Sequence, residues 1–220
     1  VFPEEKFIIL EKTPFYGESG GQAGDTGIIA AESKEVRVVE TLITPKGVVA
    51  HEVDDINGLG EKMKVVATID ASKRKATEIH HTATHLLHKA LREVLGDHVK
   101  QSGSYVGPDK LRFDFSHFSA MSRAEVEKIE EIINHKIREK IKVEVLKKSY
   151  KDAVKMGATA LFGEKYSEQV RVLSMSDFSV ELCGGIHVQR TGDIGLLKIT
   201  SEAGVAAGVR RSEALTGQGA

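Results

Sequence analysis

The stretch DASKRKATEIHHTATHLLHKALREVLG, residues 70–96, decides the organisation of this chain. The pattern predicts one helix, because Asp70 or Ser72 can cap its first turn and Gly96 stands where a C-terminal cap belongs. An apolar stripe at helical spacing supports the same prediction, and its members are Ile79, Ala83, Leu86, Leu87, Ala90, Leu91 and Val94.

Two motifs carry the candidate chemistry. At about 100° per residue, His81 and His85 fall one turn apart on the helix face opposite the stripe, so we expect them to point toward solvent or a cleft. The second motif, Cys183-Gly-Gly-Ile-His187, holds the one cysteine of the chain. One thiolate and three imidazoles suit tetrahedral zinc, which predicts one Zn²⁺ per chain on these four residues. The alternative is a buried structural cysteine with solvated histidines. His88 shares the histidine face, and we expect it to be a surface or supporting residue.

Composition bounds the class of protein. The chain has 220 residues, 29% charged and 40% hydrophobic, which permits one large domain or two small ones. A single cysteine excludes an internal disulfide framework and fits a reducing compartment such as the cytoplasm. No apolar run is long enough to cross a membrane. The opening Val1-Phe2-Pro3, without Met or signal peptide, suggests a piece of a longer chain.

The net charge of −1 counts against a nucleic-acid binder that works by charge alone. Local basic clusters remain, and Arg210-Arg211 is one candidate contact for phosphate. Solvated surface charge is the competing interpretation for any such cluster.

Short segments rich in Val and Ile fill the first seventy residues, at 6–11, 27–31, 36–43, 47–53 and 64–69. They predict a small β-barrel or sandwich over residues 1–70, joined to a mixed α/β region over 71–220, an α+β fold overall. In the second region, Ser122-Arg-Ala-Glu125 is a capping box that begins another helix. Further strands are expected at 141–146, 170–175, 195–200 and 208–215, with a short helix at 149–156.

The segment from Gly17 to Gly27 holds five glycines in eleven residues. It lacks the Gly-Lys-Ser/Thr of a phosphate-binding P-loop and the spacing of a dinucleotide fingerprint. It is either a series of tight turns or a loop whose backbone lies against a ligand.

The residue after His81 is Thr82, where a metalloprotease helix needs a Glu as general base. The protease class is therefore excluded by the motif itself. Asp177 and Glu181 are the carboxylates nearest to Cys183 in sequence, and either is a candidate base or a partner that orients a ligand histidine.

Several motifs resemble the editing domain of bacterial alanyl-tRNA synthetases, and the resemblance covers nearly all of the chain. The matching stretches are Thr13–Gln22, His81–His85, Lys100–Ser104, Leu111–His117, Ala160–Tyr166, Cys183–His187 and Gly204–Arg211. A looser similarity extends to free-standing alanyl-tRNA editing proteins and to the threonyl-tRNA synthetase editing domain. The resemblance implies a hydrolase that deacylates tRNA(Ala) mischarged with serine or glycine. It also implies a small β-barrel joined to an α/β domain, with a zinc cleft near the junction.

The same resemblance assigns roles to residues. The zinc ligands of the family match His81, His85, Cys183 and His187. Adding Asp177 from the sequence argument, the catalytic candidates are Gln101, Thr84 and Asp177. The substrate-binding candidates are Ser104, Gly20, Gly21, Gln22, Arg210 and Arg211. One position departs from the family, since Ile186 stands where a threonine is usual. The implied partners are the acceptor end of tRNA(Ala) and the aminoacylation and C-terminal domains of a parent chain.

A physical argument explains the need for such a site. A pocket shaped for alanine rejects glycine by only ~1–3 kcal/mol and serine by ~10²-fold. An editing pocket can spare alanine if it hydrogen-bonds the serine hydroxyl, with Thr84 as first candidate and Gln101 as second. Zinc in such a site is either closed by four ligands or open to a water molecule. Two other classes compete: a zinc-stapled tRNA-binding module without catalysis, and a general metal-dependent esterase.

Overall fold

The computed structural model describes residues 6–32, 34–159 and 167–220. The family-like stretch Ala160–Tyr166 lies outside the described residues. The chain divides into two compact units, Val1–Ala76 and Thr77–Ala220, and the division falls inside its first helix. None of the helices among the described residues combines the length and hydropathy that a membrane crossing requires.

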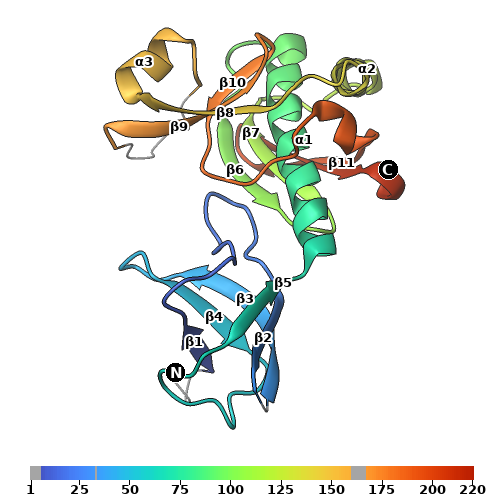
Figure 1. The fold of residues 1–220 in the computed structure, drawn as a ribbon. Coiled ribbons are helices and arrows are strands. Elements are labelled where there is room, and N and C mark those ends of the chain that lie inside the picture. Colours follow the sequence, from blue (N-terminus) through green and yellow to red (C-terminus); the bar gives the residue numbers. More distant parts are fainter. Residues whose placement is uncertain (1–5, 33, 160–166) are drawn as a thin grey trace. The chain divides into compact units, whose positions relative to one another are not determined.

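The N-terminal unit holds a five-stranded antiparallel sheet of order β1-β4-β3-β2-β5 (Figure 1). Its strands are β1 (Phe7–Ile9), β2 (Gly27–Ala31), β3 (Lys34–Ile43), β4 (Val49–Val53) and β5 (Val66–Ile69). The strand segments predicted from sequence are close to these, but the predicted barrel is wrong. In the described part of the chain, β1 pairs only with β4 and β5 only with β2, so the sheet stays open.

The core of this unit follows from alternation along its strands. Val36 and Val38 on β3 are buried while their neighbours are exposed, as a half-buried strand requires. With them in one cluster pack the buried side chains of Ile8, Phe15, Ile29, Val53 and Ile56.

The glycine-rich segment contains a tight hairpin turn. Ser19 and Gln22 pair as an isolated bridge, and Gly20 and Gly21 between them have φ of 59° and 82°. Two positive φ values in a two-residue turn favour glycine at both places. At Gly24 a Cβ atom would collide with the carbonyl oxygen of Thr41. Turn geometry and close packing therefore account for these glycines, and a ligand role for the segment stays a prediction.

In its described residues, the C-terminal unit holds two antiparallel sheets and three α-helices, which confirms the α+β class (Figure 1). The helices are α1 (Ala71–Leu95), α2 (Arg123–Arg138) and α3 (Tyr150–Lys155). One sheet has the order β11-β12-β7-β6 and the other β10-β9-β8. Their strands are β6 (Gln101–Val106), β7 (Leu111–Ser116), β8 (Glu144–Ser149), β9 (Gln169–Met175), β10 (Ser179–Leu182), β11 (Leu197–Ala206) and β12 (Val209–Thr216). Short 3₁₀ turns occur at η2 (Thr191–Ile194) and η3 (Gly217–Gly219).

Local signals fix the helix ends as predicted. Asp70 accepts hydrogen bonds from the backbone N–H groups of Ser72 and Lys73 at 3.1 and 3.0 Å, and Gly96 after α1 has a φ of +114°. Both bonds of the capping box between Ser122 and Glu125 are present at the start of α2.

The strand expected at 141–146 is displaced toward the C-terminus and becomes β8. The backbone N–H of Val143 instead donates to the carbonyl of Gln189 at 2.9 Å. Strands β6, β7 and β10 were not predicted from the hydrophobic pattern.

One large core unites α1 with β7 and α2. Leu86, Leu87 and Leu91 from α1 are fully buried in the same cluster as Phe113 and Phe115 of β7. The opposite face of α1 is buried as well, since His81, His85 and His88 are 7%, 7% and 3% exposed. Of the two expectations for this face, solvent or a cleft, burial excludes solvent, because the chain after β9 covers the face.

Candidate metal centre and amino-acid pocket

The structure brings the four predicted ligands together. His81 and His85 come from α1, while Cys183 and His187 come from the loop after β10. One ligand atom of each lies within 4.8 Å of the others. Cys183 Sγ lies 3.4 Å from Nε2 of His81 and 3.3 Å from Nε2 of His187. This four-residue group is able to hold a metal ion.

The protonation states of Cys183 and His187 suit metal binding. Burial disfavours the Cys183 thiolate, but the charge of His85 and the polar contacts of the sulfur with the rings of His187 and His81 outweigh it and hold the pKa of Cys183 well below its usual range. The backbone N–H of Gly185 also donates to the sulfur at 3.4 Å. Burial lowers the pKa of His187 to about 3, which keeps its ring neutral. Thiolate and neutral imidazole are the forms that bind metals.

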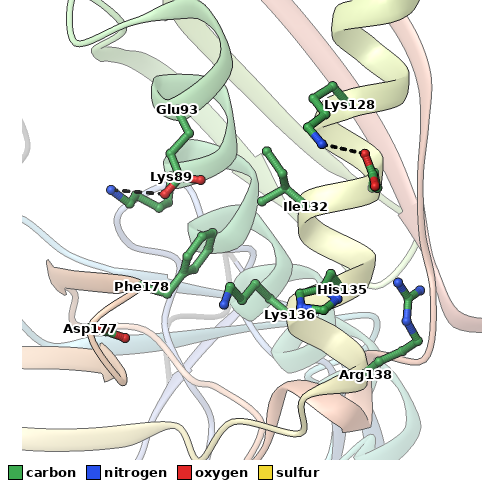
Figure 2. A pocket seen from close by; sticks show the side chains of 10 residues that line it. Lys89, Glu93, Lys128, Ile132, His135, Lys136, Arg138, Asp177 and Phe178 are labelled. Carbon is green, nitrogen blue, oxygen red and sulfur yellow. Dashed lines mark hydrogen bonds and ion pairs between the residues drawn. The ribbon is translucent and has the colours of Figure 1, made fainter.

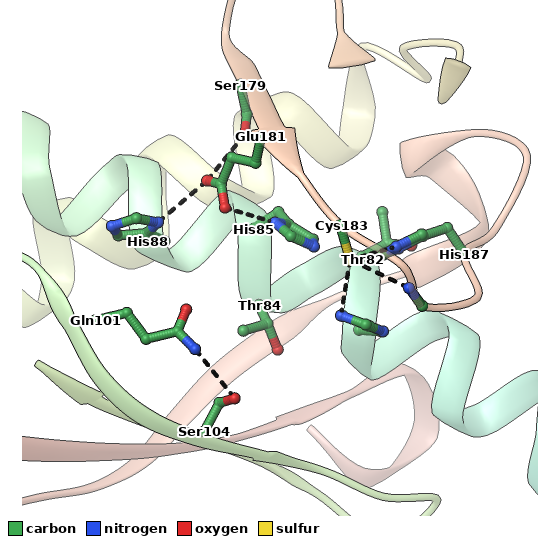
Figure 3. Close-up of polar contacts among 12 residues, drawn as sticks. Thr82, Thr84, His85, His88, Gln101, Ser104, Ser179, Glu181, Cys183 and His187 are labelled. Carbon is green, nitrogen blue, oxygen red and sulfur yellow. Dashed lines mark hydrogen bonds and ion pairs between the residues drawn. The ribbon is translucent and has the colours of Figure 1, made fainter. Parts of the chain in front are cut away.

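A buried carboxylate supports one ligand from outside the group. Glu181 is 6% exposed and accepts a hydrogen bond from Nδ1 of His85 at 2.8 Å (Figure 3). Burial disfavours charge on both groups, but their mutual attraction raises the pKa of His85 and lowers that of Glu181. Nε2 of His85 is buried, and a metal ion bound there would take the place of its proton.

His88 lies outside the four-residue group, where it contacts the second oxygen of the same carboxylate. Its Nδ1 lies 3.1 Å from Oε1 of Glu181, which also accepts from the hydroxyl of Ser179 at 3.3 Å. Figure 3 shows the carboxylate lying between the two histidines. Of the two carboxylates considered from sequence, Glu181 is therefore the one that orients a ligand histidine.

Asp177 is not brought to this group. It lies in the exposed turn between β9 and β10, where the hydroxyl of Ser176 donates to it at 3.2 Å. It lines a surface cavity of about 560 Å³ beside α1 and α2, together with Lys89 and Phe178 (Figure 2). Strand β10 separates it in sequence from Glu181 and Cys183. A catalytic role for Asp177 stays a prediction that no contact in the structure supports.

The predicted amino-acid pocket residues lie on α1 and β6. Thr84 is 6% exposed, and its hydroxyl donates to the carbonyl of His80 at 2.8 Å. On β6, the amide of Gln101 donates to the hydroxyl of Ser104 at 3.2 Å. Figure 3 shows Thr84 on the side of α1 that faces this pair. Because the Thr84 proton is already donated, its oxygen is left to accept a hydrogen bond from a ligand.

The two arginines proposed as substrate contacts are engaged within the C-terminal sheet. Arg210 pairs with Glu202 across the β11–β12 hairpin, with Nη2 and Oε2 2.7 Å apart. Arg211 makes two hydrogen bonds to Asp114 of β7, at 2.7 and 2.8 Å. A phosphate would have to compete with these carboxylates. The other substrate candidates, Gly20, Gly21 and Gln22, belong to the hairpin turn of the N-terminal unit.

Arg171 is a site residue that the sequence did not suggest. Its Nη1 donates to the carbonyl of Cys183 at 3.2 Å and also to that of Gly185, so it holds the ligand loop in place. No motif marks it, because its partners come together only when β9 pairs with β10.

Known proteins match this chain along its whole length. A family model described as the threonyl and alanyl tRNA synthetase second additional domain matches residues 170–211, which include Cys183 and His187. A second, described as tRNA synthetases class II (A), matches residues 3–73. The alanine–tRNA ligase of Acetivibrio thermocellus is 54% identical over 215 residues, 97% of this chain and 24% of that protein. The chain belongs to the alanyl-tRNA synthetase family. The resemblance predicted from its motifs is thereby confirmed.

Other members of the alanyl-tRNA synthetase family match equally broadly. The alanine–tRNA ligase of Desulfosudis oleivorans is 51% identical over 218 residues, 99% of this chain and 25% of that protein. That of Halorhodospira halophila is 52% identical over 217 residues, 98% of this chain and 25% of that protein. The chain thus spans about a quarter of the length of the relatives that it matches. A match to the second additional domain of these synthetases supports a role in tRNA-synthetase proofreading.

Proposed function

We propose that this chain is a zinc-dependent hydrolase that deacylates Ser-tRNA(Ala) and Gly-tRNA(Ala), as the proofreading part of an alanyl-tRNA synthetase. One observation carries the proposal: a buried hydrogen-bond acceptor, Thr84, lies one residue before His85 of the Cys/His group. A ligand set of three histidines and one cysteine suits zinc, which when bound supplies a Lewis acid.

Thr84 provides the selection of serine. Its oxygen accepts the proton of the substrate hydroxyl, because its own proton is held by His80. Alanine has no hydroxyl and would leave this buried acceptor unpaired, at a cost of about 1–3 kcal/mol. Alanine is therefore spared. Glycine does not use this contact, and its acceptance follows from another feature of the pocket.

The bond that breaks is the ester between the amino-acid carbonyl carbon and a ribose oxygen of the tRNA. Water gives its oxygen to the carbonyl carbon, and the ribose oxygen leaves with a proton. Glu181 is engaged by His85 and His88 and does not act as the base in this proposal. The neighbouring ribose hydroxyl is the group that assists the leaving oxygen.

The partners follow from this activity. The substrate is the acceptor end of tRNA(Ala), and the aminoacylation and C-terminal domains of a parent chain hold the rest of the tRNA. Such an enzyme works in the cytoplasm, where a free thiolate ligand persists.

The test is a deacylation panel with the zinc-loaded and the metal-free chain. Ser-, Gly- and Ala-tRNA(Ala) are the tRNA substrates, and small amino-acid esters are the control. We expect the zinc-loaded chain to hydrolyse Ser- and Gly-tRNA(Ala) and to spare Ala-tRNA(Ala) and the esters. Binding of tRNA without any hydrolysis would replace the proposal by a zinc-stapled binding module. Equal hydrolysis of small esters would replace it by a general esterase.

A further inference from the structure

Two side chains outside the four-residue group each contact one of its histidines. Thr82 on α1 lies beside His187, with Oγ1 and Nδ1 3.3 Å apart. Glu181 on β10 lies beside His85, with Oε2 and Nδ1 2.8 Å apart. In both pairs the contact is made at Nδ1, on the side of the ring away from Nε2.

The hydrogen bonds around Thr82 decide which atom carries the proton. Its single hydroxyl proton is donated to the carbonyl of Glu78 at 2.9 Å, the usual bond of a threonine inside a helix. The oxygen therefore only accepts, and it already accepts from the backbone N–H of Val188 at 3.2 Å. His187 must then donate from Nδ1, which leaves the lone pair on Nε2. That atom is the one that lies 3.3 Å from the sulfur of Cys183.

Glu181 imposes the same choice on His85. Oε2 of Glu181 lies at hydrogen-bonding distance from Nδ1 of His85, so Nδ1 donates to this oxygen. Nε2 of His85 is buried, and it is the ring nitrogen left to bind a metal in place of a proton. The second oxygen of Glu181 faces Nδ1 of His88 at 3.1 Å, which fixes the direction of the carboxylate.

We propose that Thr82 and Glu181 are positioning residues that hold His187 and His85 in the tautomer that presents Nε2 to a metal. Thr82 has a second effect, because its bonds to Val188 and His187 join α1 to the chain that follows Cys183. The hydroxyl of Thr82 thus links the two ligand-bearing segments, α1 and the chain after Cys183, which are about a hundred residues apart in sequence. A partner on the far nitrogen of a ligand histidine commonly changes metal affinity by about 10- to 100-fold. This inference rests on metal binding in the proposed function, and it is independent of the hydrolysis.

The first experiment measures zinc affinity by competition with a chelator. Thr82→Val removes the hydroxyl at nearly constant shape and should weaken zinc binding by about 10- to 100-fold. Thr82→Ser keeps the hydroxyl and should restore affinity close to that of the unsubstituted chain. Thr84→Val is the matched control, since the hydroxyl of Thr84 donates within α1, to the carbonyl of His80, and the zinc affinity of this variant should not change. Equal affinities of Thr82→Val and Thr84→Val would overturn the role of Thr82.

Glu181→Gln offers one accepting oxygen in place of two, so it should weaken zinc binding by a similar factor. Asp177→Asn is its control, because this exposed carboxylate on the same hairpin does not contact the histidines. Affinity of Glu181→Gln equal to that of Asp177→Asn would overturn the role of Glu181.

A second readout separates positioning from general stability. Nitrogen-15 NMR of the histidine rings in the zinc-loaded chain should show Nε2 bound to metal and Nδ1 protonated for both His85 and His187. Nδ1 ligation in either ring would overturn the inference even if the variants bind zinc weakly. If the unsubstituted chain binds no zinc, the inference and the proposed function both fail. If it binds zinc and deacylates Ser-tRNA(Ala), while Thr82→Val and Glu181→Gln bind zinc as tightly, only the inference fails.

Discussion

Replacing Thr84 by valine should remove the preference for serine while leaving the metal centre intact. Thr84 is 6% exposed, and its hydroxyl donates its proton to the carbonyl of His80 at 2.8 Å, so the hydroxyl acts toward a ligand as an acceptor only. Valine keeps the branched shape and suits the same helical backbone. The change therefore removes one hydrogen-bond acceptor from the pocket and little else.

The expected fall in the hydrolysis of Ser-tRNA(Ala) follows from the hydrogen bonding of the substrate hydroxyl. Without the Thr84 oxygen the serine hydroxyl loses this acceptor, and a buried hydroxyl left unpaired costs about 1–3 kcal/mol. Since 1.4 kcal/mol is about tenfold, hydrolysis of Ser-tRNA(Ala) should fall by about 5- to 150-fold in kcat/KM. Gly-tRNA(Ala) has no hydroxyl to lose, and its rate should stay within about twofold.

The assay compares single-turnover deacylation of the two mischarged tRNAs by Thr84→Val and by the unsubstituted chain, with zinc content measured on the same samples. Loading both substrates on the same tRNA cancels differences in tRNA binding. The reasoning is refuted if the ratio of serine to glycine rates stays unchanged in a variant that holds its zinc.

Three further outcomes test other parts of the structure. We expect one zinc per chain, and Cys183→Ala should lose most of it when both chains are measured by atomic absorption. Full occupancy in the variant would contradict the ligand set. Because Arg210 and Arg211 are held by carboxylates, tRNA binding should use only two or three phosphates and show a salt slope of about −0.7 to −0.9 for each. Tight, tRNA(Ala)-selective binding at physiological salt would contradict that expectation. Burial lowers the pKa of His51 below its ordinary 6.5, so the unfolded chain takes up a proton first and stability should fall as pH drops below about 6.5. Urea unfolding at pH 7.5 and 5.5 should show a smaller loss for His51→Gln, and an equal loss would exclude His51 as a cause.

Local features of the sequence were enough to predict the elements that carry the ligands. Asp70 and Gly96 mark the two ends of α1, as predicted, because capping depends on residues that are near in sequence. The spacing of His81 and His85 places them on one helix face, whatever packs against it. The four-residue group was predicted from the spacing within its two motifs and from the types of donor that they carry.

Other features depended on which distant segments meet. The predicted barrel failed because closure needs the two edge strands β1 and β5 to pair, and no pattern within a strand specifies its neighbour. Strands β6 and β7 were missed because Gly103, Asp114 and other polar residues interrupt their hydrophobic pattern.

The residues of the candidate site also fall into two sets, those predicted from the sequence and those found only in the structure. The sequence by itself determined the donor atoms, because a helical repeat and a four-residue spacing are local geometry. Only the tertiary structure decided that Glu181, and not Asp177, supports His85, and that Thr82 supports His187. Both are hydrogen bonds between residues about a hundred positions apart, and their directions are fixed by packing. Such hydrogen bonds form only when two distant segments of the backbone have packed together. No local sequence pattern specifies that packing.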